Sequence, residues 1–218
     1  AVLASDGNLY ITYADGAGPH GHWAVPEPME AGQVWRYNTA TGAWTNITPA
    51  GFTRGFGGIS IDPANPARLV LSTINTWMQQ YGSAYGDRIL ISSNRGTSWT
   101  DVIDRGFAMN NNGIPWISGH AIHWTGSIEF DPFNTGRVWV SSGNGVFKTE
   151  NINSTVTTWD FTVKGLEETV PLGLVSVPGG PLVSVIGDYD GFRHTDVRSY
   201  GPIHQPRMGT STGIAVAA

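Results

Sequence analysis

The fold is decided by a motif that occurs twice, as GISIDPANPARLVL at residues 58–71 and, 69 residues later, as SIEFDPFNTGRVWV at residues 127–140. In each copy an alternating strand runs into Asp-Pro-x-Asn, and a second apolar strand follows an Arg. Alternation with a period of two on both sides of an Asp-Pro/Asn turn predicts a β-hairpin. A hairpin that returns at a fixed spacing indicates a repeat architecture.

A second repeated feature follows each hairpin and ends in Trp. Residues 92–99 read SSNRGTSW, close to the Asp-box pattern Ser-x-Asp-x-Gly-x-Thr-Trp, with Asn94 in place of Asp and Ser98 in place of Thr. The Asx side chain is expected to cap its own turn, and Gly allows positive φ. The Trp is expected to fill the gap between neighbouring sheets. Looser versions end at Trp44 and Trp159.

Short strands grouped every 55 to 70 residues, each group closed by a turn and a Trp, predict an all-β protein built of four-stranded β-propeller blades. We expect residues 1–49 to be the end of one blade, 55–103 and 124–163 to be complete blades, and 171–218 to begin a further one. About three and a half blades do not close a ring. With no initiator Met, both ends therefore read as cuts within a longer protein.

Composition excludes several classes of function. The net charge is −5 and the 12 basic residues are scattered, which argues against a nucleic-acid partner. No apolar run approaches the roughly 20 residues that span a membrane. The absence of cysteine excludes disulfides, a thiol nucleophile and thiolate metal sites. We expect no cofactor and no metal, because the spacings of His20/His22 and His120/His123 fit no known zinc pattern.

Three insertions that do not fit the blade pattern carry aromatic residues, at residues 14–32, 75–87 and 105–124. Aromatic loops on a rigid scaffold commonly form a binding surface, and the flat CH faces of sugars stack on such rings. The alternative is that these aromatics cover blade edges. We expect the substrate-binding residues to include Trp77, Tyr81, Trp116 and Trp124.

The most informative polar stretch is IGDYDGFRH at residues 186–194. An apolar strand runs directly into Gly-Asp and then a Gly turn, which places the Asp188 side chain at a strand end. A catalytic carboxylate and a turn-capping Asp are both compatible with this spacing.

Several stretches together resemble glycoside hydrolase family 74, the xyloglucanases and oligoxyloglucan-releasing enzymes. They are LYITYADGAGP (9–19), VWRYN (34–38), WTNITP (44–49), FGG (56–58), EFDPFN (129–134), GLEET (165–169), and GD with GFRH (187–188 and 191–194). The resemblance implies a secreted protein of two seven-bladed propellers that cleaves the β-1,4-glucan backbone of xyloglucan with inversion. Its remaining blades would be the partner of this chain.

Within that resemblance, Asp188 matches the general acid, which must keep its proton near neutral pH. Inversion requires a second carboxylate roughly 6.5–9.5 Å away, and the resemblance places this base outside the chain. Arg193 and His194 match the end of the motif and are expected to bind substrate. The family commonly has Gly where this chain has Asp190, so Asp190 would either act on Asp188 or face elsewhere.

Other functions remain open on the sequence alone. A propeller that only binds polysaccharide would use the same tryptophans. A sortilin-like protein-binding propeller is disfavoured by the lack of cysteine, and a sialidase by the lack of a recognisable cluster of three arginines.

Overall fold

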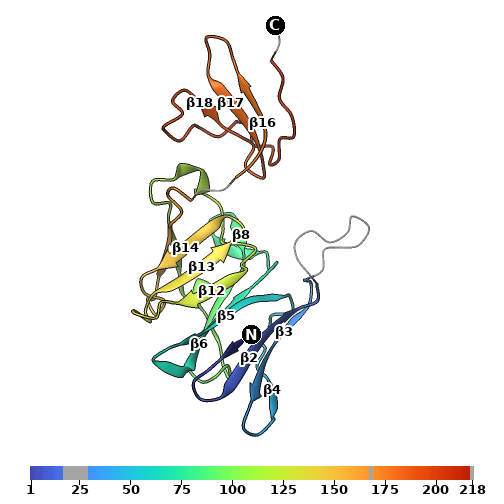
Figure 1. The fold of residues 1–218 in the computed structure, drawn as a ribbon, viewed down its shortest axis with the longest axis vertical. Coiled ribbons are helices and arrows are strands. Elements are labelled where there is room, and N and C mark those ends of the chain that lie inside the picture. Colours follow the sequence, from blue (N-terminus) through green and yellow to red (C-terminus); the bar gives the residue numbers. More distant parts are fainter. Residues whose placement is uncertain (17–28, 167–168, 217–218) are drawn as a thin grey trace. The chain divides into compact units, whose positions relative to one another are not determined.

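The computed structural model describes residues 1–16, 29–166 and 169–216. They form two compact units (Figure 1): the first contains residues 1–112 and 119–162, and the second residues 113–118 and 163–218. Regular structure is almost entirely β, arranged mainly in antiparallel sheets of about four strands. This confirms the predicted all-β class.

The first sheet of the first unit has four antiparallel strands in sequence order. They are β1 (Val2–Leu3), β2 (Asn8–Ala14), β3 (Gly32–Asn38) and β4 (Trp44–Asn46). Residues 1–49 therefore hold four strands, where the sequence suggested only the end of a blade. Strands of two and three residues, such as β1 and β4, are too short to show an alternating pattern.

The second sheet contains the first predicted hairpin and has the order β10-β9-β6-β5. Its strands are β5 (Phe56–Asp62), β6 (Asn65–Thr73), β9 (Ile89–Ser92) and β10 (Thr100–Asp101). The insertion between β6 and β9 forms its own hairpin, β7 (Met78–Tyr81) with β8 (Ala84–Gly86). A single helical turn, α1 (Val102–Arg105), follows β10 and is capped by the Asp101 carboxylate.

The third sheet contains the second predicted hairpin, with Ile128 opposite Val140. Its strands are β12 (Ser127–Phe130), β13 (Val138–Ser142), β14 (Gly145–Thr149) and β15 (Thr157–Phe161). A fifth strand from the 105–124 insertion, β11 (Phe107–Asn110), pairs in parallel with β15 at the sheet edge. The sequence did not suggest this strand. The 3₁₀ turn η1 (Pro115–Ile117) follows β11 but belongs to the second unit.

Successive sheets of the first unit pack face to face. Between the first two sheets the core contains Tyr10 and Val34 from one side and Leu69, Leu71 and Leu90 from the other. Between the second and third sheets the backbones approach closely: a Cβ on Gly57 would lie 2.0 Å from the Thr125 carbonyl oxygen. Glycine is required there because any side chain would push the two sheets apart.

The Asp-box turn has the hydrogen bonds expected of it. Asn94 Oδ1 accepts from the Ser98 N–H at 2.9 Å, and Trp99 Nε1 donates to the Ile47 carbonyl at 2.8 Å, linking the first two sheets. Trp159 is fully buried. Trp44 differs from the expectation, since it is 53% exposed and its ring lies tilted against Tyr37, with centroids 4.7 Å apart. It fills no gap between the sheets that the structure describes.

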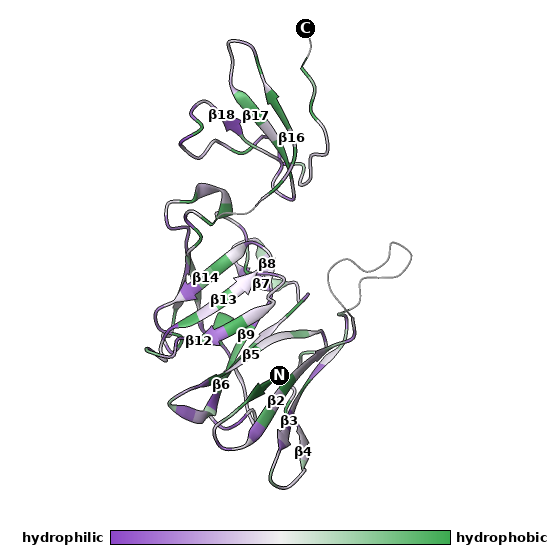
Figure 2. Cartoon of the chain, in the orientation of Figure 1, coloured by the Kyte–Doolittle hydropathy of each residue, from purple (hydrophilic) through white to green (hydrophobic). Residues whose placement is uncertain are grey.

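The second unit contains a three-stranded antiparallel sheet in the order β16-β17-β18. The strands are β16 (Val170–Ser176), β17 (Leu182–Gly187) and β18 (Arg193–His194). Figure 2 colours β18 as hydrophilic, in contrast to the apolar residues along β17. In the part of the chain that is described, no helix is long and apolar enough to cross a membrane.

Candidate functional site

Asp188 directly follows β17, at the strand end that the sequence indicated. Its backbone is left-handed, with φ of 65°, and its N–H donates to Thr210 Oγ1 at 2.9 Å. The Thr210 hydroxyl in turn donates to Asp188 Oδ1 at 3.3 Å. The side chain is exposed, so a ligand can reach the carboxylate.

Asp190 lies two residues further on and has a different role. Its side chain is fully buried and accepts hydrogen bonds from Arg207 Nε and from the N–H groups of Met208 and Gly209, the last at 2.6 Å. Burial alone would raise the pKa of Asp190, but these donors hold it below its usual value. Asp190 therefore fixes the 207–209 segment. Its φ of 60° breaks the strand geometry that would have placed it on the same face as Asp188.

Tyr189, between the two acids, packs edge-on against Trp116 with ring centroids 4.9 Å apart. Burial, together with the nearby Asp188 carboxylate, raises the pKa of Tyr189. Trp116 is only 5% exposed. Its ring therefore serves as a wall within the second unit, and offers little surface for a sugar to stack on.

A cavity of about 570 Å³ lies in the second unit beside this wall. Trp116, Phe192, His194, Lys164 and Tyr200 are among the residues that line it. His194 Nε2 lies 3.3 Å from Ser184 Oγ, which fixes the imidazole at the cavity edge. Arg193 is exposed and faces the opposite side of β18 by strand alternation. Of the predicted residues, Trp116 and His194 share this cavity. Asp188 and Arg193 are not part of its described lining.

The first unit brings together two of the other predicted residues, Trp77 and Trp124, with their rings 6.1 Å apart and nearly perpendicular. His123 lies against Trp77 at 5.3 Å. Trp77 is 48% exposed, and its Nε1 donates to Asn75 Oδ1 at 2.8 Å, which fixes the orientation of the indole. We call Trp77, His123 and Trp124 the aromatic platform.

Tyr81 does not join the aromatic platform. Its hydroxyl donates to the His120 carbonyl at 2.7 Å and its ring stacks on Phe107 at 5.1 Å. Burial raises the pKa of Tyr81. These contacts attach the β7–β8 hairpin to the 105–124 insertion, which makes Tyr81 a support for the platform loops.

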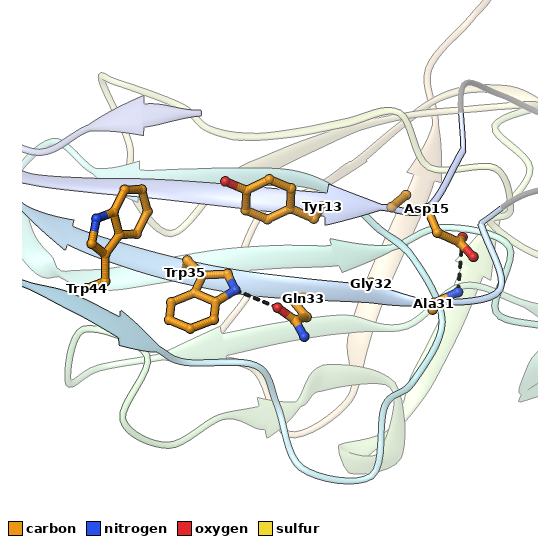
Figure 3. Close-up of a pocket in the computed structure, with 8 residues that line it drawn as sticks. Tyr13, Asp15, Ala31, Gly32, Gln33, Trp35 and Trp44 are labelled. Carbon is orange, nitrogen blue, oxygen red and sulfur yellow. Dashed lines mark hydrogen bonds between the residues drawn. The ribbon is translucent and has the colours of Figure 1, made fainter.

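A groove of about 540 Å³ that the sequence did not indicate lies along the open face of the first sheet (Figure 3). Tyr13, Gln33, Trp35 and Trp44 point into it from neighbouring strands, and Trp35 Nε1 donates to Gln33 Oε1 at 2.7 Å. At its end Asp15 accepts from the Ala31 N–H, a hydrogen bond that lowers the pKa of Asp15. In β3, Gln33 and Trp35 flank the buried Val34, and this short alternation is the signal that could have revealed this face.

His, Asp and Glu side chains are also potential metal ligands. Within residues 1–16, 29–166 and 169–216, no three His, Asp or Glu side chains lie close enough together to hold an ion. His20 and His22 lie outside the described residues, as does Trp23 of the same insertion.

Comparison with known proteins covers nearly the whole chain. A xyloglucanase of a Paenibacillus species is 34% identical over 90% of this chain, and xyloglucanase Xgh74A of Acetivibrio thermocellus is 33% identical over 99%. The crystal structure of the Niastella koreensis GH74 enzyme superposes with a TM-score of 0.84 at 45% identity over 96% of the chain. This chain belongs to glycoside hydrolase family 74.

A second family 74 structure, the xyloglucanase of Xanthomonas campestris, superposes with a TM-score of 0.78 at 29% identity. No family model matches the sequence. The chain spans only 21% and 28% of the length of the two bacterial relatives and 30% of the Niastella structure. It therefore corresponds to less than a third of a family 74 enzyme.

Proposed function

We propose that this chain is a segment of a secreted, inverting family 74 glycoside hydrolase that cleaves the β-1,4-glucan backbone of xyloglucan. The observation that carries the proposal is the similarity to xyloglucanases over 90–99% of the chain. Asp188 is the general acid. It is exposed at a strand end, whereas Asp190, the other acid of the same turn, is buried and holds the 207–209 segment. The general base lies outside the chain and completes the pair that inversion needs.

The substrate-binding residues would act at two places. In the second unit, Trp116 and His194 line the 570 Å³ cavity, and Arg193 is exposed on β18 next to it in sequence. In the first unit, Trp77 and Trp124 of the aromatic platform stack on sugar rings, with Tyr81 supporting them.

The rest of the enzyme is the structural partner of this chain. One face of the first sheet, with Tyr10 and Val34, packs on the second sheet, and the second packs on the third in the same manner. The opposite face of the first sheet, with Tyr13 and Trp44, is open and aromatic. Continuing the same packing, a further blade covers this face in a seven-bladed propeller, one of two, and buries Trp44 as the Asp-box pattern predicts.

The test is hydrolysis of tamarind xyloglucan by the intact protein, measured as the release of reducing ends. Asp188→Asn is expected to lower kcat by about 10²- to 10⁴-fold, the usual contribution of a general acid. Asp196→Asn is the matched control, because Asp196 is an acid of the same unit with only a local pairing to Arg198. NMR of the first-formed anomer tests inversion.

Full activity of the Asp188→Asn enzyme would remove Asp188 from the mechanism. The exposed Trp77 favours one other function, polysaccharide binding without cleavage. An intact protein that leaves xyloglucan uncut but is retarded in a xyloglucan gel would have that function.

A further inference from the structure

Asp87 is a buried carboxylate that is hydrogen-bonded to both tryptophan loops of the aromatic platform, and none of the roles above uses it. It is 1% exposed and precedes β9. Its Oδ1 accepts from the Thr76 N–H at 2.9 Å and from the Thr73 hydroxyl at 3.2 Å. Its Oδ2 accepts from the Thr125 N–H at 2.9 Å. The two backbone donors come from separate loops, and each adjoins a tryptophan of the platform.

These contacts require a hydrogen-bond acceptor at both oxygens of the Asp87 side chain. An ionised carboxylate can accept at both oxygens, whereas an amide has one accepting oxygen and an NH₂ group that would face a backbone N–H. Among the residues that the structure describes, Asp87 forms no ion pair, and the neighbouring Arg88 guanidinium pairs with Asp101 and Asp104 instead. A buried charge without a paired cation is costly. This cost indicates that the Asp87 carboxylate has a role other than stabilising the fold.

The backbone of the platform also needs an external restraint. Trp124 has φ of 50° and Asn75 has φ of 58°, a left-handed conformation that is strained for a bulky side chain. Such a conformation persists only where the surroundings determine it. Asp87 binds the residue directly after Trp124. Gln80 binds the same loop at Ile122, accepting from its N–H at 3.0 Å and donating to its carbonyl at 2.7 Å.

We propose that Asp87 is a positioning residue for saccharide binding: its two carboxylate oxygens hold the Trp77 and Trp124 loops at the spacing that forms the aromatic platform. The inference rests on the proposed function, since it needs the platform to bind sugar. Asp87 acts only through the loops and does not touch the ligand.

Protonation of Asp87 supplies a readout that a purely structural role would not give. Burial raises the pKa of Asp87 to about 6, and protonation occupies one oxygen that would otherwise accept an N–H. The groups that face the carboxylate from β6 and the two loops are the uncharged Thr73, Thr76 and Thr125. His123 in the platform also carries a titratable imidazole, so the experiment must separate its contribution from that of Asp87.

The experiment measures binding of tamarind xyloglucan by calorimetry to the intact protein carrying Asp188→Asn, which slows cleavage of the polysaccharide about 10²- to 10⁴-fold. Asp87→Asn is expected to weaken binding about ten-fold, or roughly 1.4 kcal/mol, and Trp77→Ala at least as much. The matched control is Asp62→Asn. Asp62 is also buried but lies beyond the other end of β6, roughly 25 Å from Thr73 at about 3.3 Å per residue, so binding should change less than about two-fold.

The pH profile provides a second test that needs no change at Asp87. Affinity should fall as the pH drops through about 6, and His123→Gln should keep that midpoint. A flat pH profile overturns the inference, and so does the loss of the pH dependence in a His123→Gln protein that still binds xyloglucan. Both results can be obtained even if Asp87→Asn does not fold. If Trp77→Ala and Trp124→Ala bind normally, the platform function itself fails. If they weaken binding while Asp87→Asn does not, only the positioning role of Asp87 fails.

Discussion

The hydroxyl of Ser60 donates a 2.7 Å hydrogen bond to Oε2 of Glu129, the residue that occupies the same position one repeat later. Ser60 Oγ also accepts from the Phe130 N–H at 3.2 Å. Equivalent positions of two successive hairpins are thus in contact, and Arg68 reinforces the same junction by lying 4.7 Å from the centre of the Phe130 ring. The 69-residue spacing in the sequence therefore corresponds to a physical junction between neighbouring sheets.

Removing this junction should destabilise the first unit. Ser60→Ala leaves the buried Phe130 N–H without its acceptor and should lower the free energy of unfolding by about 1–3 kcal/mol, measured by urea denaturation. Glu129→Gln keeps an accepting oxygen and should cost less than about 1 kcal/mol. Equal losses in the two variants would contradict the assignment of the cost to Phe130.

The two Asp-box tryptophans should differ sharply. Trp99→Phe removes the 2.8 Å hydrogen bond to the Ile47 carbonyl between sheets and should cost about 1–2 kcal/mol of unfolding free energy. Trp44→Phe in this chain should change it by less than about 0.5 kcal/mol, because Trp44 is 53% exposed. In the intact enzyme we expect the cost of Trp44→Phe to increase if a neighbouring blade covers it.

Asp190 should hold the C-terminal segment at neutral pH. Its pKa is lowered in the folded protein, so its stabilising effect is present above the usual carboxyl range and is lost as the pH falls through the folded value. Asp190→Asn weakens the pairing with Arg207 and should make cleavage by trypsin after Arg207 faster. Unchanged cleavage at neutral pH would show that the segment is held by other contacts.

Asp87 should have the opposite effect on stability with pH. Its folded pKa is about 6, above the ordinary 3.8, so the native state is favoured when the group is protonated. This contribution is fully present below about pH 4 and is lost as the pH rises through about 6, a difference of about 3 kcal/mol. Urea denaturation at several pH values should show it in the wild type and not in Asp87→Asn. Acidification would then strengthen the fold while weakening saccharide binding.

The sequence predicted those parts of the structure that local pattern determines. Both Asp-Pro hairpins, the Asp-box turn and the strand that ends before Asp188 follow from alternation and turn chemistry within a few residues. The parallel strand β11 was missed because its pairing with β15 depends on residues about 50 positions away, and its four residues show no clear period.

The candidate site was less predictable for the same reason. Trp116 was expected to be a stacking surface, but its burial is set by Tyr189 in a distant part of the sequence. The Asp190 carboxylate accepts hydrogen bonds from residues 207–209, a stretch without periodicity. Asp87 gave no signal, since a single Asp in a polar loop is common and only the folded chain brings Thr76 and Thr125 to it.

The turn that carries Asp188 also limits which residues can replace those at positions 188–191. Asp188 and Asp190 both have left-handed backbones, and a Cβ on Gly191 would lie 2.0 Å from the Ser184 carbonyl oxygen. Gly, Asn and Asp are the residues that adopt this backbone routinely. Selection at residues 188–191 therefore acts on backbone geometry as well as on acidity. Alanine scanning would confound the two, whereas Asn isolates the chemistry.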